Sequence, residues 1–187
     1  MDLAGKARAA QAGLIAYLLM SAASLAYDFR GGMGAQVDPW GTLDWIELAV
    51  FAMVILPFGF WTAALFRTLR RPRGPQGLPA PRVAAVVAYL FPLTLFFPWL
   101  FFRRAADVLE DVRGRRLATL AFLVLPAIAL GLLIVWTTAS DPTILDRMTG
   151  YDIASWMTEA AIGTAEVALI SRLTRSTLAK GVERVFD

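Results

Sequence analysis

The sequence predicts an all-α integral membrane protein, a helical bundle with four spans and one further membrane segment that prolines break. Of the 187 residues, 58% are hydrophobic and only 18% are charged, whereas soluble domains carry about 25% charged residues. The mean hydropathy is +0.59. Apolar runs of about 20 residues, enough for a helix to cross a bilayer, recur along the chain. We therefore expect a single transmembrane domain over residues 1–187.

Four runs are long and apolar enough to be spans, and the first of them has a second interpretation. The runs cover about residues 11–27, 45–66, 117–136 and 153–173. Lys6 and Arg8 precede the first run, and the small residues Ser24 and Ala26 stand near its end, which is also typical of a secretion signal. We expect this segment to be retained as a span.

Charge alternates between the segments that join these runs. Most basic residues lie in 67–82, in 103–116 and from Arg172 onward, while 28–44 and 137–152 are acidic. Because loops rich in arginine stay on the cytoplasmic side, the pattern predicts cytoplasmic N- and C-termini in a bacterial inner membrane, and it does not indicate nucleic-acid binding. The arginines expected at the cytoplasmic face or at lipid headgroups are Arg67, Arg70, Arg71, Arg103, Arg104, Arg115 and Arg116.

The apolar segment 83–102 holds Pro92, Thr94 and Pro98 and allows two topologies. A kinked fifth span would place the basic segment 103–116 and the basic tail outside, against the positive-inside rule. A re-entrant hairpin that turns between the two prolines keeps every loop consistent with the rule, because each proline removes a backbone donor and disfavours helix before it. We favour the hairpin, which must then be buried among other helices.

The segment after it, 105–116, carries acids beside its arginines and is typical of a short amphipathic helix at the membrane surface. On such a helix Glu110 and Arg113 stand three residues apart, so we expect them to form a weak, solvated pair.

Two carboxylates, Glu159 and Glu166, lie inside the last span and form the candidate polar site with Ser155. They are seven residues apart and therefore share one helix face. A charge in the hydrocarbon costs at least about 2.5 kcal/mol, so this face should turn inward. It could conduct protons or cations, or it could pair with arginines and hydroxyls of neighbouring helices. We favour the structural interpretation, because no other predicted span offers matching acids.

Cysteine and histidine are both absent from the chain. Their absence excludes disulfides, Cys or His metal ligands, His-ligated haem and the common nucleophile–histidine pairs. We expect no enzymatic activity and no cofactor. The leading hypothesis is a structural or accessory subunit that lies in the lipid bilayer and packs against other membrane proteins or itself. The alternative is a transporter or channel-like protein that uses Glu159 and Glu166 with the broken segment.

Several motif residues lie from the second predicted span onward: Trp61, Arg67, Arg70, Tyr89-Leu-Phe-Pro92, Pro98 and Glu110. In these residues the chain resembles, over about residues 45–180, a bacterial family of multi-span membrane proteins, domain of unknown function number 4328. Where the family has an asparagine between two prolines and one more residue of spacing, this chain has Thr94. The resemblance implies a small multi-span membrane protein and brings no activity with it.

Overall fold

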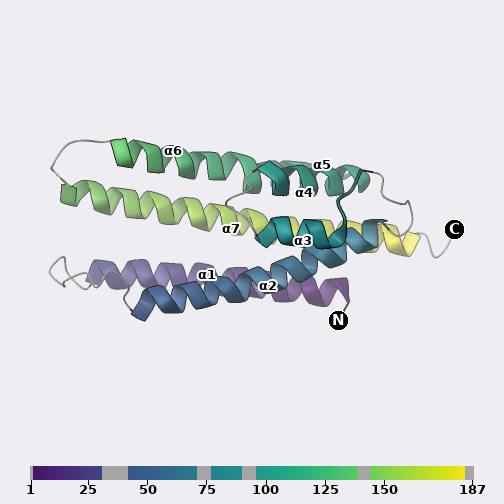
Figure 1. The fold of residues 1–187 in the computed structure, drawn as a ribbon, viewed down its shortest axis with the longest axis horizontal. Helices are drawn as coiled ribbons and strands as arrows, with labels where there is room; N and C mark the ends of the chain where they lie inside the picture. Colours follow the sequence, from purple (N-terminus) through teal and green to yellow (C-terminus); the bar gives the residue numbers. More distant parts are fainter. Residues whose placement is uncertain (1, 31–41, 71–76, 90–95, 139–143, 184–187) are drawn as a thin grey trace.

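The computed structural model describes residues 2–30, 42–70, 77–89, 96–138 and 144–183, and every regular element in these ranges is helical (Figure 1). The all-α prediction is therefore confirmed. Pro92, Thr94 and Arg71 lie outside the described residues. In chain order the elements are α1 (Leu3–Arg30), α2 (Thr42–Arg70), α3 (Pro81–Tyr89), α4 (Phe96–Val108), α5 (Val112–Thr119), a π-helical turn (Leu120–Val124), α6 (Leu125–Thr138) and α7 (Ile144–Glu183).

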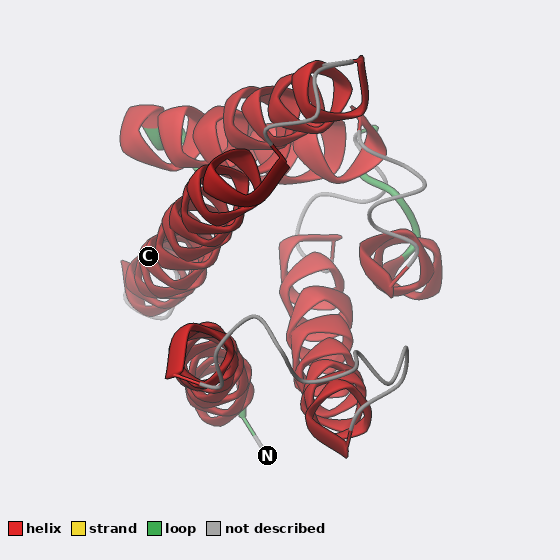
Figure 2. Ribbon diagram, turned by 90° about the vertical axis from the view of Figure 1, so that its left-hand side faces the viewer, coloured by secondary structure: helices red, strands yellow, loops and turns green. Residues whose placement is uncertain are grey.

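The long helices form two layers, with α1 against α2 in one and α6 against α7 in the other (Figure 1). Contacts between α1 and α7 join the layers. Seen along its long axis, the described part is a bundle of helices without strands (Figure 2). The short helices α3, α4 and α5 lie at the end of the bundle where α1 begins and α7 finishes (Figure 1). We call this end the basic end, because the arginine-rich segments lie there.

Two helical stretches are long and apolar enough to cross a membrane, Val112–Val135 and Ile153–Gly181. They cover residues 117–135 of the predicted span 117–136 and all of the predicted span 153–173. The predicted spans 11–27 and 45–66 are helical within α1 and α2. Among the described residues, however, only Val112–Val135 and Ile153–Gly181 are long and apolar enough to count as candidate membrane spans. The helices are also longer than the predicted spans. For example, α7 begins at Ile144, within the segment 137–152 that was predicted to be a loop. Hydropathy marks the apolar part of a helix, whereas backbone hydrogen bonding continues beyond it.

One continuous helix runs from Val112 to Thr138, and it contains a π-helical turn directly before Pro126. Proline has no N–H, and its ring clashes with the carbonyl four residues earlier. In the π turn Leu125 N donates to the carbonyl of Leu120, five residues back. The wider turn thus lets the helix pass the proline without ending, as π-bulges commonly do.

The predicted helix over residues 105–116 is wrong, because the chain turns a corner at Leu109–Asp111. Glu110 has a φ of 54°, a left-handed conformation that interrupts a helix. The N–H of Asp111 closes α4 by donating to the carbonyl of Ala106 at 2.8 Å. The Asp111 carboxylate then accepts from Gly114 N at 3.0 Å and caps α5. Capping gives the backbone a strong alternative to a continuous helix.

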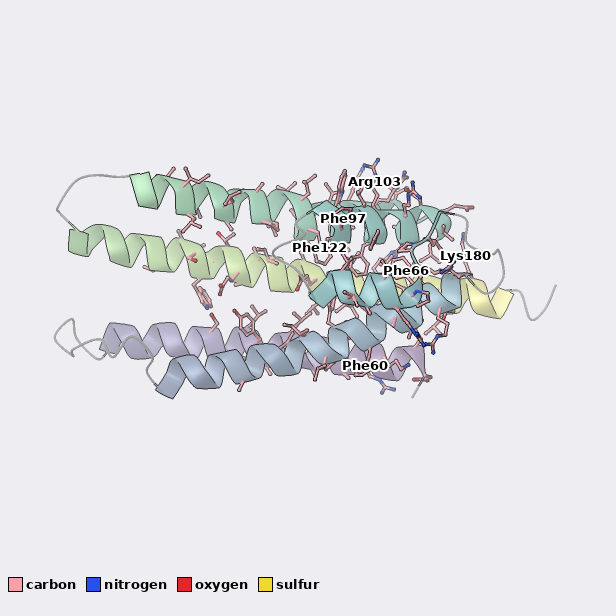
Figure 3. The ribbon with its side chains drawn as sticks, viewed as in Figure 1. Phe60, Phe66, Phe97, Arg103, Phe122 and Lys180 are labelled. Carbon is pink, nitrogen blue, oxygen red and sulfur yellow. The ribbon has the colours of Figure 1, made fainter. Side chains whose placement is uncertain are left out.

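An aromatic stack at the basic end forms the centre of the core. The Phe102 ring lies parallel to both Trp61 and Phe122, with centroids 5.7 Å and 5.1 Å away and interplanar angles of 14°. All three are at most 1% exposed. Phe58 packs against each of them. Figure 3 labels Phe122 and also Phe66, whose ring centroid lies 6.1 Å from that of Phe102. Since Phe102 belongs to α4, the short helix is an integral part of the core.

Pro98, predicted in the re-entrant turn, is instead the third residue of α4 and is fully buried. The prediction is wrong for this residue. The first N–H groups of a helix have no partner within it, so a proline there removes no helical hydrogen bond. Any turn between α3 and α4 therefore precedes Pro98.

Gly163 allows the close approach of α7 to α1. A Cβ added there would lie 2.9 Å from Cδ1 of Leu18, whereas at Gly131 it would meet nothing within 4 Å. We expect Gly163→Ala to lower the free energy of unfolding by roughly 1–3 kcal/mol, because overpacking forces neighbours apart. Gly131→Ala is the matched control and should be neutral or stabilising, since alanine favours helix by up to about 1 kcal/mol. Denaturation in mixed micelles measures both, and equal stability of the two variants would contradict the close packing.

Candidate functional site

The predicted polar face of α7 lies against α1. Ser21 Oγ of α1 donates to Glu159 Oε2 at 3.2 Å. Two turns further along α7, the side-chain amide of Gln11 donates to the carbonyl of Val167 at 3.1 Å. Gly163, between them, meets Leu18. Residue numbers fall on α1 as they rise on α7, so the two helices run antiparallel along this face.

The two glutamates of this face have different surroundings. Glu159 accepts the hydroxyl of Ser21, which is one of the structural roles expected for it. The structure gives Glu166 no hydrogen bond or ion pair to any described residue. Ser155 is half-buried, and Trp156 beside it has a buried indole N–H without a partner in the described part of the chain. The face therefore combines one paired carboxylate, one unpaired carboxylate and one unpaired donor.

The spacing along α7 does not form a relay of side chains. Seven residues of helix separate the two glutamate backbones by about 10 Å. The residue between them on the same face is Gly163, which carries no side chain. Direct proton transfer between the carboxyls would need hydrogen-bond contact at roughly 3 Å. Proton movement between the two glutamates along this face would thus depend on water.

A second polar cluster, which the sequence did not predict as a site, surrounds Asp111. Its side chain is 2% exposed. One carboxylate oxygen, Oδ2, accepts from Arg172 Nε and from Ser176 Oγ, both at 2.7 Å. The other oxygen accepts from Gly114 N. The cluster ties the corner between α4 and α5 to α7, so it fixes the basic end of the bundle.

Burial and hydrogen bonding act in opposite directions on the Asp111 carboxyl. Burial alone raises its pKa, because it disfavours the charged form. The hydrogen bonds from Arg172, Ser176 and Gly114, together with the charge of Arg172, outweigh burial and lower the pKa to about 2. Asp111 is therefore ionised at neutral pH. Aspartate is a preferred cap residue, but only the structure shows that a helix begins directly after it, at Val112.

The predicted arginines that the structure describes lie at the basic end, and they differ in their contacts. Arg104 Nη1 donates to the carbonyl of Gly77 at 2.6 Å. Arg115 pairs with Asp107 at 3.3 Å across an exposed surface. The Arg103 guanidinium lies 5.3 Å from the centre of the Trp99 ring. Figure 3 labels Arg103 and Lys180 at this end. Arg67 and Arg116 are exposed, and Arg70 is half-buried.

Glu110 is paired differently from the sequence prediction. Its Oε2 lies 3.5 Å from Lys180 Nζ of α7, so the partner that the structure gives it is distant in the chain. The corner at Leu109–Asp111 turns Glu110 toward α7 instead of along α5. Both groups reach solvent, so the pair contributes at most about 1 kcal/mol.

In the part of the chain that the structure describes, no three Asp or Glu side chains gather as metal ligands would. Comparisons of the chain with protein-family models, with curated proteins and with solved structures find no match. The resemblance to the bacterial membrane family stays a prediction.

Proposed function

We propose that the chain is a polytopic protein of the bacterial cell membrane with four spans and a re-entrant hairpin, and that it serves as a structural or accessory subunit. The observation that carries the topology is the position of α3 and α4. Their described residues, 9 and 13 in number, extend about 14 and 20 Å, and each stretch by itself is shorter than a hydrocarbon layer of about 30 Å. Both lie at the basic end, where α3 packs mainly on α2 and α4 mainly on α5 (Figure 1).

This arrangement groups the positive charge of the protein at one end. The predicted cytoplasmic segments 67–82 and 103–116 flank α3 and α4, and α1 begins and α7 finishes at the same end (Figure 1). The positive-inside rule then assigns the basic end to the cytoplasm. A re-entrant α3–α4 pair satisfies this rule for every segment, which supports the hairpin over a fifth span.

The outer surface of the bundle is apolar. Large hydrophobic side chains are exposed on every long helix, among them Leu19 at 67%, Phe60 at 61% and Met157 at 61%. In water such a surface would be unfavourable over so wide an area. It fits contact with lipid and with apolar faces of other membrane proteins. Several polar side chains, in contrast, are paired inside the bundle, such as Ser21 with Glu159 and Trp61 with Thr174, which supports a packing role over a chemical one.

Exposed residues of α6 offer a test of the accessory role. Gly131 and Ile128 are both exposed on α6, and changing them leaves the core intact. In mild detergent, partner proteins should co-purify with the wild-type chain. We expect Gly131→Trp or Ile128→Trp to abolish this co-purification, while the variant still folds. The matched control is Leu178→Trp, an exposed site on the distant part of α7. A monomeric wild type that purifies alone from its own membrane would contradict the proposal.

Proton or cation transport is the second candidate function, and the unpaired Glu166 and Trp156 favour it. Glutamine at both Glu159 and Glu166 removes the charge and keeps the size of each side chain. Because Glu159 is already engaged by Ser21, we expect no change in proton or cation flux in proteoliposomes and no loss of assembly. Glu110→Gln, at a solvated site, is the control. Flux that the wild type shows and the double variant lacks would establish transport and refute the structural interpretation.

A further inference from the structure

A surface formed by α4 and α5 combines cationic and aromatic side chains, which we call the Trp99 face: Trp99, Arg103, Arg115, Arg116 and Thr119. The Trp99 indole N–H donates to Thr119 Oγ1 at 3.1 Å and so joins the two helices. Thr119 in turn donates to the carbonyl of Arg115 at 3.0 Å. With its polar atom satisfied, the Trp99 ring is held as a platform.

Arg103 is positioned on this platform. Its guanidinium lies 5.3 Å from the ring centre, within the range of cation–π attraction. It is one helical turn after Trp99, and Asp107 follows one turn later and pairs with Arg115 at 3.3 Å. Since α4 and α5 run antiparallel between these two contacts, Arg103 lies beside the turn of α5 that carries Arg116.

The charges of the Trp99 face do not balance. Three arginines share one acid, Asp107, and that acid is already engaged by Arg115. Arg103 and Arg116 are exposed, and the structure gives neither an ion pair with any described residue. Two unpaired guanidinium groups on adjoining helices attract an anion that can receive several hydrogen bonds, as a phosphate group does.

Apolar side chains continue the face toward the middle of the bundle. Leu100 precedes Arg103 by one turn on α4 and is 41% exposed. Leu120 follows Arg116 by one turn on the adjoining helix and is also 41% exposed. On α4 Arg103 is followed toward the middle of the bundle by Leu100 and Trp99, so the surface changes from cationic to apolar over about 6 Å of helix. An anionic phospholipid changes in the same direction, from a charged phosphate to apolar acyl chains.

We propose that the Trp99 face is a binding site for one anionic phospholipid of the leaflet at the basic end, with its phosphate between Arg103 and Arg116 and its acyl chains along Leu100 and Leu120. This inference rests on the proposed membrane orientation for the depth of the site. Trp99 then lies at the interface level, where tryptophan is enriched. Bound lipid would also hold α4, and with it Phe102, against α5.

The test measures lipid binding to the purified full chain by native mass spectrometry in detergent, with phosphatidylglycerol and phosphatidylcholine as probes. We expect the wild type to prefer phosphatidylglycerol. Arg103→Gln with Arg116→Gln should weaken that binding roughly 10- to 30-fold, from the usual attraction of an interfacial arginine to anionic lipid. Lysine at both positions keeps the charge and should retain most of the phosphatidylglycerol binding.

The matched control is Arg8→Gln with Arg67→Gln, which removes two exposed charges at the same end but away from the Trp99 face. Equal losses in the two double variants would show diffuse attraction and overturn the site. So would equal affinity for the two lipids, or displacement of the lipid by millimolar inorganic phosphate. Thermal unfolding confirms that each variant is folded. Because binding is measured without a bilayer, a wrong topology leaves this result unchanged and is detected separately by thiol labelling.

Discussion

Asp111→Ala is expected to lower the free energy of unfolding by about 3 kcal/mol, because it removes a helix cap and two hydrogen bonds that a charge strengthens. The substitution leaves Gly114 N without its acceptor and Arg172 without its partner. Asp111→Asn keeps one acceptor for the cap and loses the charge, so its cost should be intermediate. Denaturation in mixed micelles gives the free energies of unfolding of the wild type and of the two variants.

Asp107→Asn provides the control for this prediction. Asp107 also pairs with an arginine, but both side chains of that pair are 44% exposed. Exposed pairs contribute about 0–1 kcal/mol, so this variant should be close to wild type. If Asp111→Ala were no more destabilising than Asp107→Asn, the cluster would not hold α7 to the corner between α4 and α5.

The stabilising contribution of the Asp111 cluster decreases as the pH falls. The pKa of Asp111 is about 2 in the folded protein against an ordinary value of 3.8. Its stabilising contribution is therefore complete above about pH 4 and is lost as the pH falls toward 2, a loss of about 2 kcal/mol. The stability of wild type relative to Asp111→Asn should decline over this interval. A constant difference between pH 5 and pH 2 would show that Asp111 does not titrate as its contacts require.

Trp61→Ala should destabilise the protein by about 3–5 kcal/mol, the usual cost of removing a large buried side chain. Trp61 is 0% exposed, stacks on Phe102 and donates its indole N–H to Thr174 Oγ1 at 3.0 Å. The cavity would lie where α2, α4 and α7 meet. Trp61→Phe keeps most of the packing and loses the hydrogen bond, so about 1–2 kcal/mol is expected.

Phe60→Ala is the matched control, since Phe60 is the preceding residue on the same helix and is 61% exposed (Figure 3). It should change the stability by less than about 1 kcal/mol. Micelle denaturation and the near-ultraviolet circular dichroism of the core aromatics measure both variants. Similar losses of stability in Trp61→Ala and Phe60→Ala would mean that the aromatic stack does not organise the basic end.

The helical class and the positions of the apolar segments could be predicted, because hydropathy over about 20 residues is a local property. The corner at Leu109–Asp111 could not, because residues 105–116 read as a continuous helix until Asp111 meets Arg172 and Ser176 of a distant helix. For the same reason the pairing of Glu110 with Lys180 was missed, since the two are far apart in the chain.

The candidate polar site was predictable in part. The shared face of Glu159 and Glu166 follows from their spacing, but the hydroxyl that engages Glu159 belongs to Ser21 of α1, and only the packing of α1 on α7 reveals it. Pro98 shows the opposite error. A proline in an apolar segment indicates a break, yet in the first turn of a helix it removes no hydrogen bond, and Pro98 is the third residue of α4.

The central claim is that the two arginine-rich segments lie on the same side of the membrane, and thiol labelling tests it most directly. The chain contains no cysteine, so single cysteines at Ala80, Arg113 and Gly181, all exposed, can be probed with a membrane-impermeant reagent. If α3 and α4 form a re-entrant hairpin, all three should react only after the cells are permeabilised. Reaction of the cysteines at 113 and 181 in intact cells, with protection at 80, would contradict the hairpin and make 83–102 a crossing.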